Sequence, residues 1–210
     1  GVRIDDVAAI KALGLFPEEI ADIGFSAYVH QIFVDGFFHG DPHPGNLLVT
    51  DQGEIAFLDY GLVGVLRPER RRVFVELLLA MTRTDVAGVI AALEKLDVHI
   101  RPADLDSVKD DLYIVLLDYR EMKLERVNFA VTLRGLTDTL RRYHIRVPSS
   151  LMLMTKVIIM VMDIGTRLDP TFNFDQRIRP YLIEIATQQR LSPDNLTGAV
   201  RSFMGAAESL

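Results

Sequence analysis

Two polar loops separated by a short apolar hairpin constrain the fold of this 210-residue chain more than any other feature. The first loop, HGDPHPGN, spans His39–Asn46, and the second, LDYG, places Asp59 thirteen residues after Asn46. Between them, LLV and IAFL flank a Thr-Asp-Gln-Gly turn, a pattern typical of two short strands in which Gly53 takes a positive φ. Because such a hairpin returns the chain to its starting point, we expect Asp59 to face Asn46.

Helical patterns fill most of the remaining sequence. Pro17, followed by two glutamates, predicts a helix start, and that helix should run to about Gly36. Apolar residues spaced at 3.6 positions, together with proline and serine start signals, predict further helices downstream. These begin near Pro68, Pro102, Phe129, Pro148 (stopping before Asp169) and Ser192. The predicted fold class is mainly α with one short β-hairpin.

The composition excludes several classes of protein. The net charge is −6, so nucleic acid is not an expected partner, because binding to its phosphates requires a basic surface. The chain has no cysteine, which rules out disulfides and thiolate metal sites. The most apolar stretch, LMLMTKVIIMVMD, is interrupted by Lys156 and is shorter than the roughly 18 apolar residues of a membrane span. It predicts a buried helix with its methionines in the core.

Carboxylate and carboxamide groups at this spacing point to phosphoryl-transfer chemistry. Phosphoryl transfer from ATP needs a carboxylate near the attacking oxygen and oxygen ligands for Mg²⁺. In kinase catalytic loops the base Asp precedes a metal-binding Asn by five residues, as Asp41 precedes Asn46. A rigid turn would explain the prolines and glycines, but not an apolar strand running directly into Asp59. The combined pattern therefore predicts a site for Mg²⁺ and ATP phosphates.

The segment HGDPHPGNLLVTDQGEIAFLDYGLVG resembles the catalytic region of the UbiB/AarF family of atypical protein-kinase-like proteins, which is linked to ubiquinone biosynthesis. The resemblance, which extends over nearly the whole chain, implies that Asp41 is the catalytic residue. It implies that Asn46 and Asp59 hold the metal and, through it, the nucleotide. Two departures are Gly40 in place of the family's usual Ala and Tyr60 in place of Phe.

The same resemblance implies that residues 1–210 form a kinase-like C-terminal lobe. No segment matches the nucleotide-covering loop or the strand lysine of an N-terminal lobe. We therefore expect an atypical kinase or ATPase that is incomplete as this fragment, with ATP and its own N-terminal lobe as partners. The resemblance also implies a role in isoprenoid-quinone lipid metabolism, contacts with membrane lipid or quinone-pathway proteins, and a place on the cytoplasmic face of a membrane.

Two other functions stay open at this point. Small-molecule phosphotransferases of the aminoglycoside or choline kinase type have a nearly identical H-G-D-x-x-x-x-N loop, although LVGVLRPERRR does not match their continuation. A non-catalytic interaction module with a kinase-like lobe is the third alternative. Only six residues separate Gly61 from Pro68, and Gly40 stands where many protein kinases carry an arginine. Both features favour a small-molecule or lipid-related acceptor, or simple ATP hydrolysis, over protein phosphorylation.

Four further features have structural interpretations. We expect His39 to brace the loop through backbone hydrogen bonds, whereas the sequence does not decide the role of His43. Lys156 should be ion-paired or should extend its stem to solvent. We expect the arginines at 67 and 70–72 to lie at the solvent-exposed start of a helix.

Overall fold

The computed structural model describes residues 1–121 and 129–190. In that part of the chain the elements follow the order β1 (Val2–Arg3), α1 (Val7–Ala12), α2 (Pro17–Val29), η1 (His30–Asp35), β2 (Phe37–His39), η2 (Pro44–Asn46), β3 (Leu47–Val49), β4 (Ile55–Phe57), β5 (Val63–Val65), α3 (Pro68–Thr82), α4 (Val86–Lys95), α5 (Leu105–Glu121), α6 (Phe129–Arg142), α7 (Ser149–Leu168) and α8 (Phe174–Arg190).

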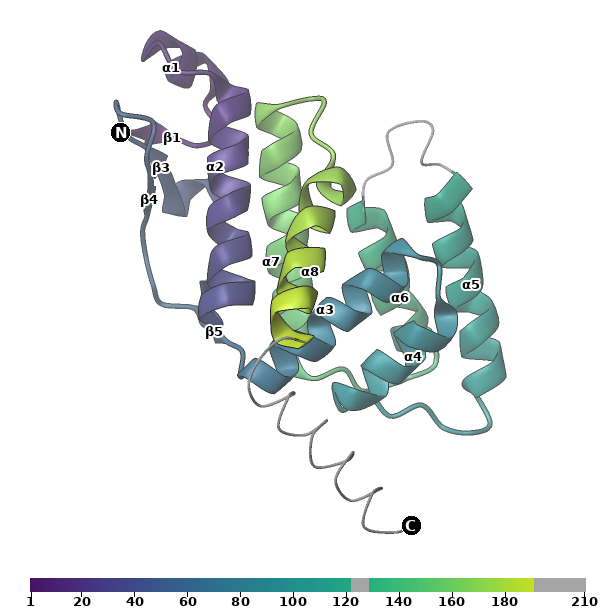
Figure 1. The fold of residues 1–210 in the computed structure, drawn as a ribbon. Coiled ribbons are helices and arrows are strands. Elements are labelled where there is room, and N and C mark those ends of the chain that lie inside the picture. The colour runs from purple at the N-terminus through teal and green to yellow at the C-terminus, as the bar shows by residue number, and fades with distance from the viewer. Residues whose placement is uncertain (122–128, 191–210) are drawn as a thin grey trace.

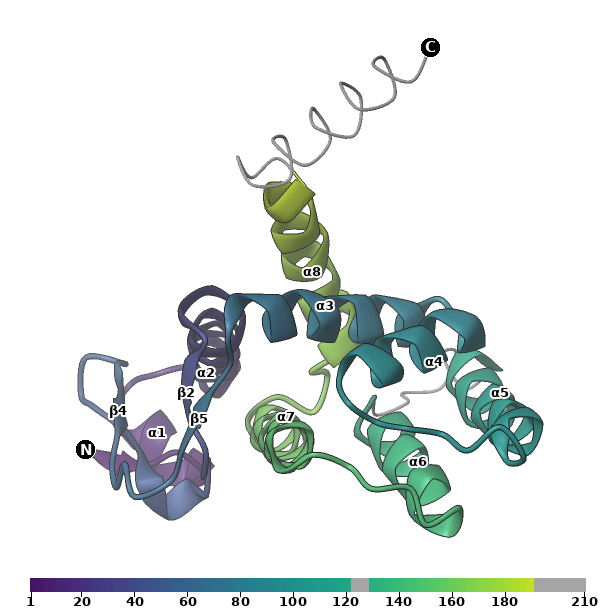
Figure 2. The same cartoon turned by 90° about the horizontal axis from the view of Figure 1, so that it is seen from below.

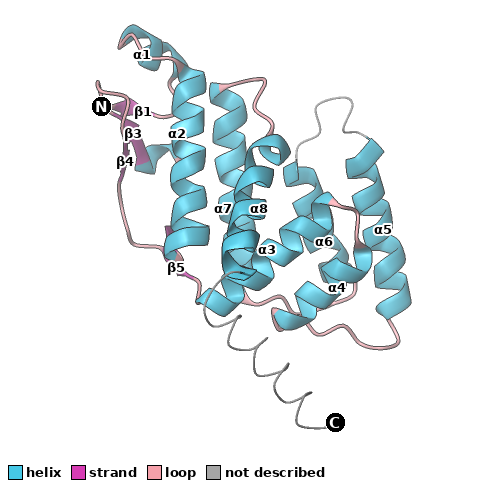
Figure 3. Ribbon diagram, viewed as in Figure 1, coloured by secondary structure: helices cyan, strands magenta, loops and turns pink. Residues whose placement is uncertain are grey.

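The strands and the helices occupy different sides of the molecule. The strands gather beside α2, near the N-terminus, and α4, α5 and α6 form the opposite side (Figure 1). Seen from below, α7 lies between α2 and α6, and α3 runs across from the strand region to α4 (Figure 2). The colouring by secondary structure shows how small the strand region is beside the helices (Figure 3). The predicted mainly α fold is confirmed.

The strands form two small antiparallel sheets. In the first, of order β1-β3-β4, Leu48 is opposite Ala56, and Gly53 in the connecting turn has φ +82°. The predicted hairpin and its positive-φ glycine are therefore confirmed. The second sheet pairs β2 with β5, with Phe38 opposite Gly64. The prediction of a single strand pair was wrong: β3 and β4 flank a recognisable turn, whereas β1, β2 and β5 pair with strands far along the chain, which no local pattern reveals.

The helix that leads into the first loop changes its winding before it ends. Pro17 is its first residue, as predicted, and regular α2 gives way to the wider π-helix η1. Gly36, at φ +70°, ends this helical run where the sequence predicts. No feature of the sequence indicates this π-helix. Short π-helical turns are frequent at functional sites.

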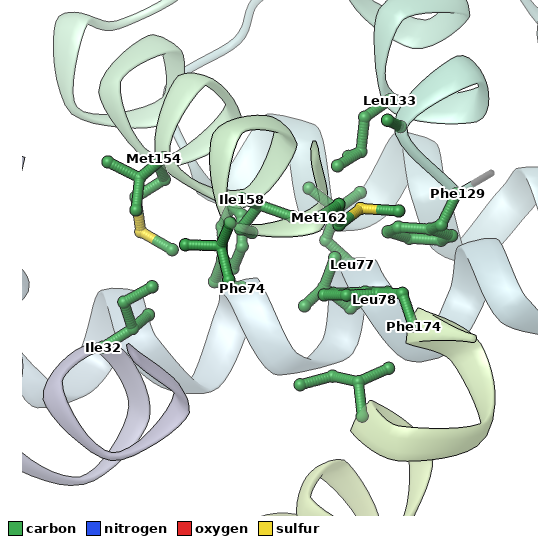
Figure 4. Packing of buried hydrophobic residues seen from close by; sticks show 14 of the residues in the cluster. Ile32, Phe74, Leu77, Leu78, Phe129, Leu133, Met154, Ile158, Met162 and Phe174 are labelled. Atoms are coloured by element: carbon green, nitrogen blue, oxygen red, sulfur yellow. The ribbon is translucent and has the colours of Figure 1, made fainter. Parts of the chain in front are cut away.

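The helices pack around one hydrophobic core, to which α2, α3, α6, α7 and α8 all contribute buried side chains. Figure 4 shows Phe74 and Leu77 of α3 beside Ile158 and Met162 of α7, with Phe174 of α8 next to them. These side chains are buried, so α3 is the central helix that its nearly continuous apolar sequence predicts.

The remaining helix predictions can be compared one by one. The predicted helices at α5, α6 and α7 are confirmed, whereas α1, α4 and α8 were not singled out. The predicted start at Ser192 lies outside the described residues. On α7, Met154 and Met162 are core residues, but Met152 and Met160 are only half-buried. Within the described residues, no helix is both long and apolar enough to cross a membrane.

Candidate functional site

The hairpin and β5 bring the two polar loops together. The amide of Leu58 donates a hydrogen bond to the carbonyl of Asn46 at 2.8 Å. The amide of Gly40 also donates to the carbonyl of Leu62 at 2.9 Å, which extends the β2–β5 pairing. The segment around Asp59 is therefore held against the HGDPHPGN loop, as the hairpin predicted.

His39 fastens the two loops to each other from inside. Its side chain is fully buried, and its Nε2 donates to the carbonyls of Leu58 and Asp59, at 2.8 and 3.2 Å. Because a carbonyl can only accept, Nε2 carries the proton, and Nδ1 is free to accept the amide of Asp41 at 3.3 Å. The predicted bracing role of His39 is confirmed, and both ring nitrogens are used in it.

Asp41 and Asn46 are in direct contact. The Nδ2 group of Asn46 donates to the carbonyl of Asp41 at 3.2 Å and to its Oδ2 at 3.3 Å. Only the NH₂ end of the carboxamide can donate to both oxygens, so the Oδ1 of Asn46 takes no part in this contact. The five-residue spacing thus places the carboxylate and the carboxamide side by side.

Asp59 takes an unusual backbone conformation, with φ +54°. Its side chain is exposed, and its Oδ1 accepts the amide of Gly61 at 3.1 Å, an Asx-type turn that tolerates positive φ. Among the described residues, this carboxylate is hydrogen-bonded to neither Asp41 nor Asn46. The backbone of Asp59 is therefore placed beside the first loop, while convergence of its carboxylate with Asn46 on one ion stays a prediction.

Lys156 of α7 supplies a contact that the sequence did not reveal. Its Nζ lies 2.9 Å from the Oδ1 of Asp41, and both side chains are partly exposed. Of the two roles predicted for Lys156, the structure shows the ion pair, and its partner lies 115 residues away. The only signal in the sequence was a single lysine inside an otherwise apolar stretch.

Two smaller features complete the loop. The Nδ1 of His43 accepts the amide of Gly45 at 3.1 Å, so this exposed histidine caps the 3₁₀ turn η2. At Gly40 an added Cβ would lie 2.9 Å from Cγ of Leu62 and 3.0 Å from its carbonyl oxygen. Glycine at position 40, where the family usually has alanine, therefore allows the Leu62 segment to approach closely.

The site offers few side-chain oxygens that could hold a metal ion. Among the described residues, no group of three or more His, Asp or Glu side chains is placed to hold a metal. Within the described part of the chain, the Oδ1 of Asn46 and the second oxygen of the Asp59 carboxylate take part in none of these hydrogen bonds. A small number of protein oxygens, completed by water and phosphate, is the coordination that Mg²⁺ prefers.

Comparisons with known proteins give two matching family models. Residues 1–93 match the family model of the ABC1 atypical kinase-like domain, and residues 113–173 match the UbiB helical domain. The chain is 31% identical over 207 residues to a "Probable protein kinase UbiB" of Vibrio vulnificus, which covers 96% of the chain and 38% of the relative. A protein of the same name from Aeromonas hydrophila is 30% identical over 211 residues, covering 96% and 37%.

A third relative, an uncharacterized Synechocystis protein, is 26% identical over 186 residues, covering 88% of this chain and 32% of the relative. The chain thus spans about a third of the length of these curated relatives. The fold and the matched models define a kinase-like protein. Within that class, the chain belongs to the UbiB family.

Proposed function

We propose that this chain is the metal- and phosphate-binding part of an atypical kinase or ATPase that uses Mg²⁺ and ATP. The observation that carries the proposal is the paired arrangement of Asp41 and Asn46, in which the amide donates to the carboxylate and leaves its own oxygen free. Membership of a family whose relatives are named probable protein kinases supports the same chemistry.

Each residue of the site has a distinct task in this proposal. Asp41 orients the attacking hydroxyl or water and accepts its proton, and Asn46 holds the Asp41 carboxylate in place. The free oxygens of Asn46 and Asp59 hold Mg²⁺, which when bound neutralises charge on the ATP phosphates. His39 orients the site without touching substrate, because both of its nitrogens are bonded to backbone.

The surface around Asp59 supports a lipid-related acceptor. Leu58, Tyr60 and Leu62 alternate along the segment after the hairpin, and all three are exposed by 40% or more. Exposed apolar side chains beside a polar site are typical of a surface that another apolar group covers. We propose that an N-terminal lobe or an apolar acceptor covers them, and that the reaction belongs to isoprenoid-quinone lipid metabolism at the cytoplasmic face of a membrane.

The test is Mg²⁺-dependent ATP hydrolysis by the full-length protein, with and without Asp59→Asn. The variant keeps the side chain's size but removes its charge, so we expect turnover to fall about a hundredfold or more. Asp51→Asn is the matched control, because Asp51 is an exposed acid in the hairpin turn of the same segment. Chelation of Mg²⁺ should abolish wild-type turnover.

Unchanged turnover in Asp59→Asn, with turnover still dependent on Mg²⁺, would show that the metal is held elsewhere. Absence of both nucleotide binding and turnover in the wild-type protein would instead favour the non-catalytic interaction module. Preferential phosphorylation of aminoglycosides or amino alcohols would favour the small-molecule phosphotransferase.

A further inference from the structure

The charge distribution on α7 singles out one lysine. Among its charged residues, Asp163 and Arg167 bond each other along the helix, with Nε of Arg167 3.0 Å from Oδ2 of Asp163. The side chain of Lys156 instead extends beyond α7 and contacts Asp41 of the first loop. The helix therefore carries one cation that is directed at the site rather than at a helical neighbour.

The two partners of this ion pair come from different parts of the family architecture. Asp41 lies in the segment that matches the ABC1 kinase-like domain, and Lys156 lies in the segment that matches the UbiB helical domain. The helical domain thus contributes a charged group directly to the candidate site.

The first loop lacks any permanent cation of its own. Residues 39–46 contain no lysine or arginine. His39 is buried, with both nitrogens bonded to backbone, so it cannot reach a ligand. Of the arginines at the start of α3, Arg70 pairs with Asp97 and Arg71 donates to the carbonyl of Val34.

The position of Lys156 suits a group that binds the terminal phosphate. A base and the phosphorus atom flank the attacking oxygen at about 3 Å each, so the phosphorus lies roughly 6 Å from the carboxylate of Asp41. The Nζ of Lys156 is 2.9 Å from that carboxylate, has three hydrogens to donate and sits on a flexible, half-exposed stem. It can therefore keep its bond to Asp41 while donating to a phosphate oxygen.

We propose that Lys156 is the phosphate-binding cation of this site and discriminates nucleoside triphosphate from diphosphate. The inference rests on the proposed function, because it assumes that a Mg²⁺-nucleotide occupies the loops. Mg²⁺ on the oxygens of Asn46 and Asp59 would leave charge on the terminal phosphate, which Lys156 neutralises from the side of α7. A diphosphate does not extend to the lysine, so it gains nothing from it.

The experiment compares the affinities of the full-length protein for two probes, by titration calorimetry in Mg²⁺. The probes are ADP and the non-hydrolysable ATP analogue with a β,γ-imido bridge. Lys156→Met keeps the length of the side chain and removes its charge. We expect roughly tenfold weaker binding of the triphosphate analogue, the size of one charge-assisted hydrogen bond, and ADP binding within about twofold of wild type.

Two further variants complete the design. Lys156→Arg keeps the charge and should recover most of the preference for triphosphate. Arg167→Met removes a cation from the same helix at a position paired with Asp163, and should leave both affinities unchanged.

An unchanged triphosphate-to-diphosphate ratio in Lys156→Met would overturn the inference and leave Lys156 as a structural ion pair. Tighter binding of both nucleotides would also overturn it, because the lysine would then be blocking the site. If the wild-type protein binds neither nucleotide, the proposed function itself fails, and the inference falls with it.

Discussion

The ring of Phe38 lies against Gly64 on the neighbouring strand, where an added Cβ would come within 2.0 Å of the ring's Cζ. Phe38 is almost completely buried, and it directly precedes His39, the residue that ties the two loops together. The close β2–β5 approach at this pair therefore sets the position of the histidine. Gly64, which has no reactive side chain, thus contributes to the geometry of the site by letting β2 approach β5 closely.

Substitution Gly64→Ala should destabilise the fold by about 3 kcal/mol, because the buried ring has no space into which to move. Unfolding in urea measures the change. Gly24→Ala is the matched control, since its nearest contact is the flexible tip of Ile55 at 3.1 Å and alanine favours the helix. A loss of less than about 1 kcal/mol for Gly64→Ala would mean that β2 and β5 separate easily.

Removal of the His39 side chain should cost about 3 kcal/mol, because it leaves a cavity and deprives the carbonyls of Leu58 and Asp59 of their donor. Hydrogen exchange at residues 58–61 should also become faster in His39→Ala. His30→Ala serves as the control, since His30 is largely exposed and, among the residues that the structure describes, pairs only with Asp35. Unchanged exchange in the second loop would contradict the bracing role.

Tyr28 of α2 should make the stability depend on alkaline pH. Its hydroxyl is buried and, within the described part of the chain, has no hydrogen-bond partner. Burial, followed by the charges of Asp41 and Tyr60, raises the pKa of Tyr28 above its ordinary value. The unfolded tyrosine therefore loses its proton first, and the wild-type protein loses stability as the pH rises beyond about 10.

Tyr28→Phe removes the unpaired hydroxyl and cannot ionise. At pH 7 we expect a change within about 1 kcal/mol, in the stabilising direction. Between pH 9 and 11 the advantage of Tyr28→Phe over wild type should grow, which denaturant unfolding at a series of pH values measures. The exposed Tyr113 gives the control variant Tyr113→Phe. A difference that stays constant with pH would contradict a raised pKa.

Arg177 of α8 should be a major stabilising residue. Its guanidinium donates to Asp169 at 3.1 Å, pairs with Asp22 of α2 and lies 4.6 Å from the ring centre of Phe172. Because Asp169 is buried, Arg177→Met would leave its charge without that partner, at a cost of about 3 kcal/mol. Thermal unfolding measures this loss, with Arg179→Met, two residues along on the same helix, as control.

A melting temperature of Arg177→Met equal to that of Arg179→Met would show that Asp169 is satisfied by the amide and hydroxyl of Thr171 alone. In that case the connection between α8 and α2 depends on the Ser26–Tyr181 hydrogen bond, at 3.2 Å, and on apolar contacts. The edge-to-face contact of Phe25 with Phe174, at 5.6 Å, is one of these.

The site was predictable from the sequence only in its local part. The five-residue interval between Asp41 and Asn46 and the hairpin turn at Gly53 depend on a few adjacent residues, so their pattern is visible in the chain. His39 as a brace was also predictable, because a histidine in a tight loop usually bonds backbone. Its partners, Leu58 and Asp59, follow from the hairpin's return.

The sequence alone determined α2, α3, α5, α6, α7 and the hairpin, because these follow from turn residues and apolar spacing over short distances. It also determined the family, through the resemblance of its loop motifs and the matched models. The tertiary structure alone decided that Lys156 reaches Asp41 across 115 residues and that Phe38 meets Gly64. Such contacts depend on how α7 packs against α2 and how β2 meets β5. No local pattern encodes them, because the free energy that selects them comes from burial of the whole core.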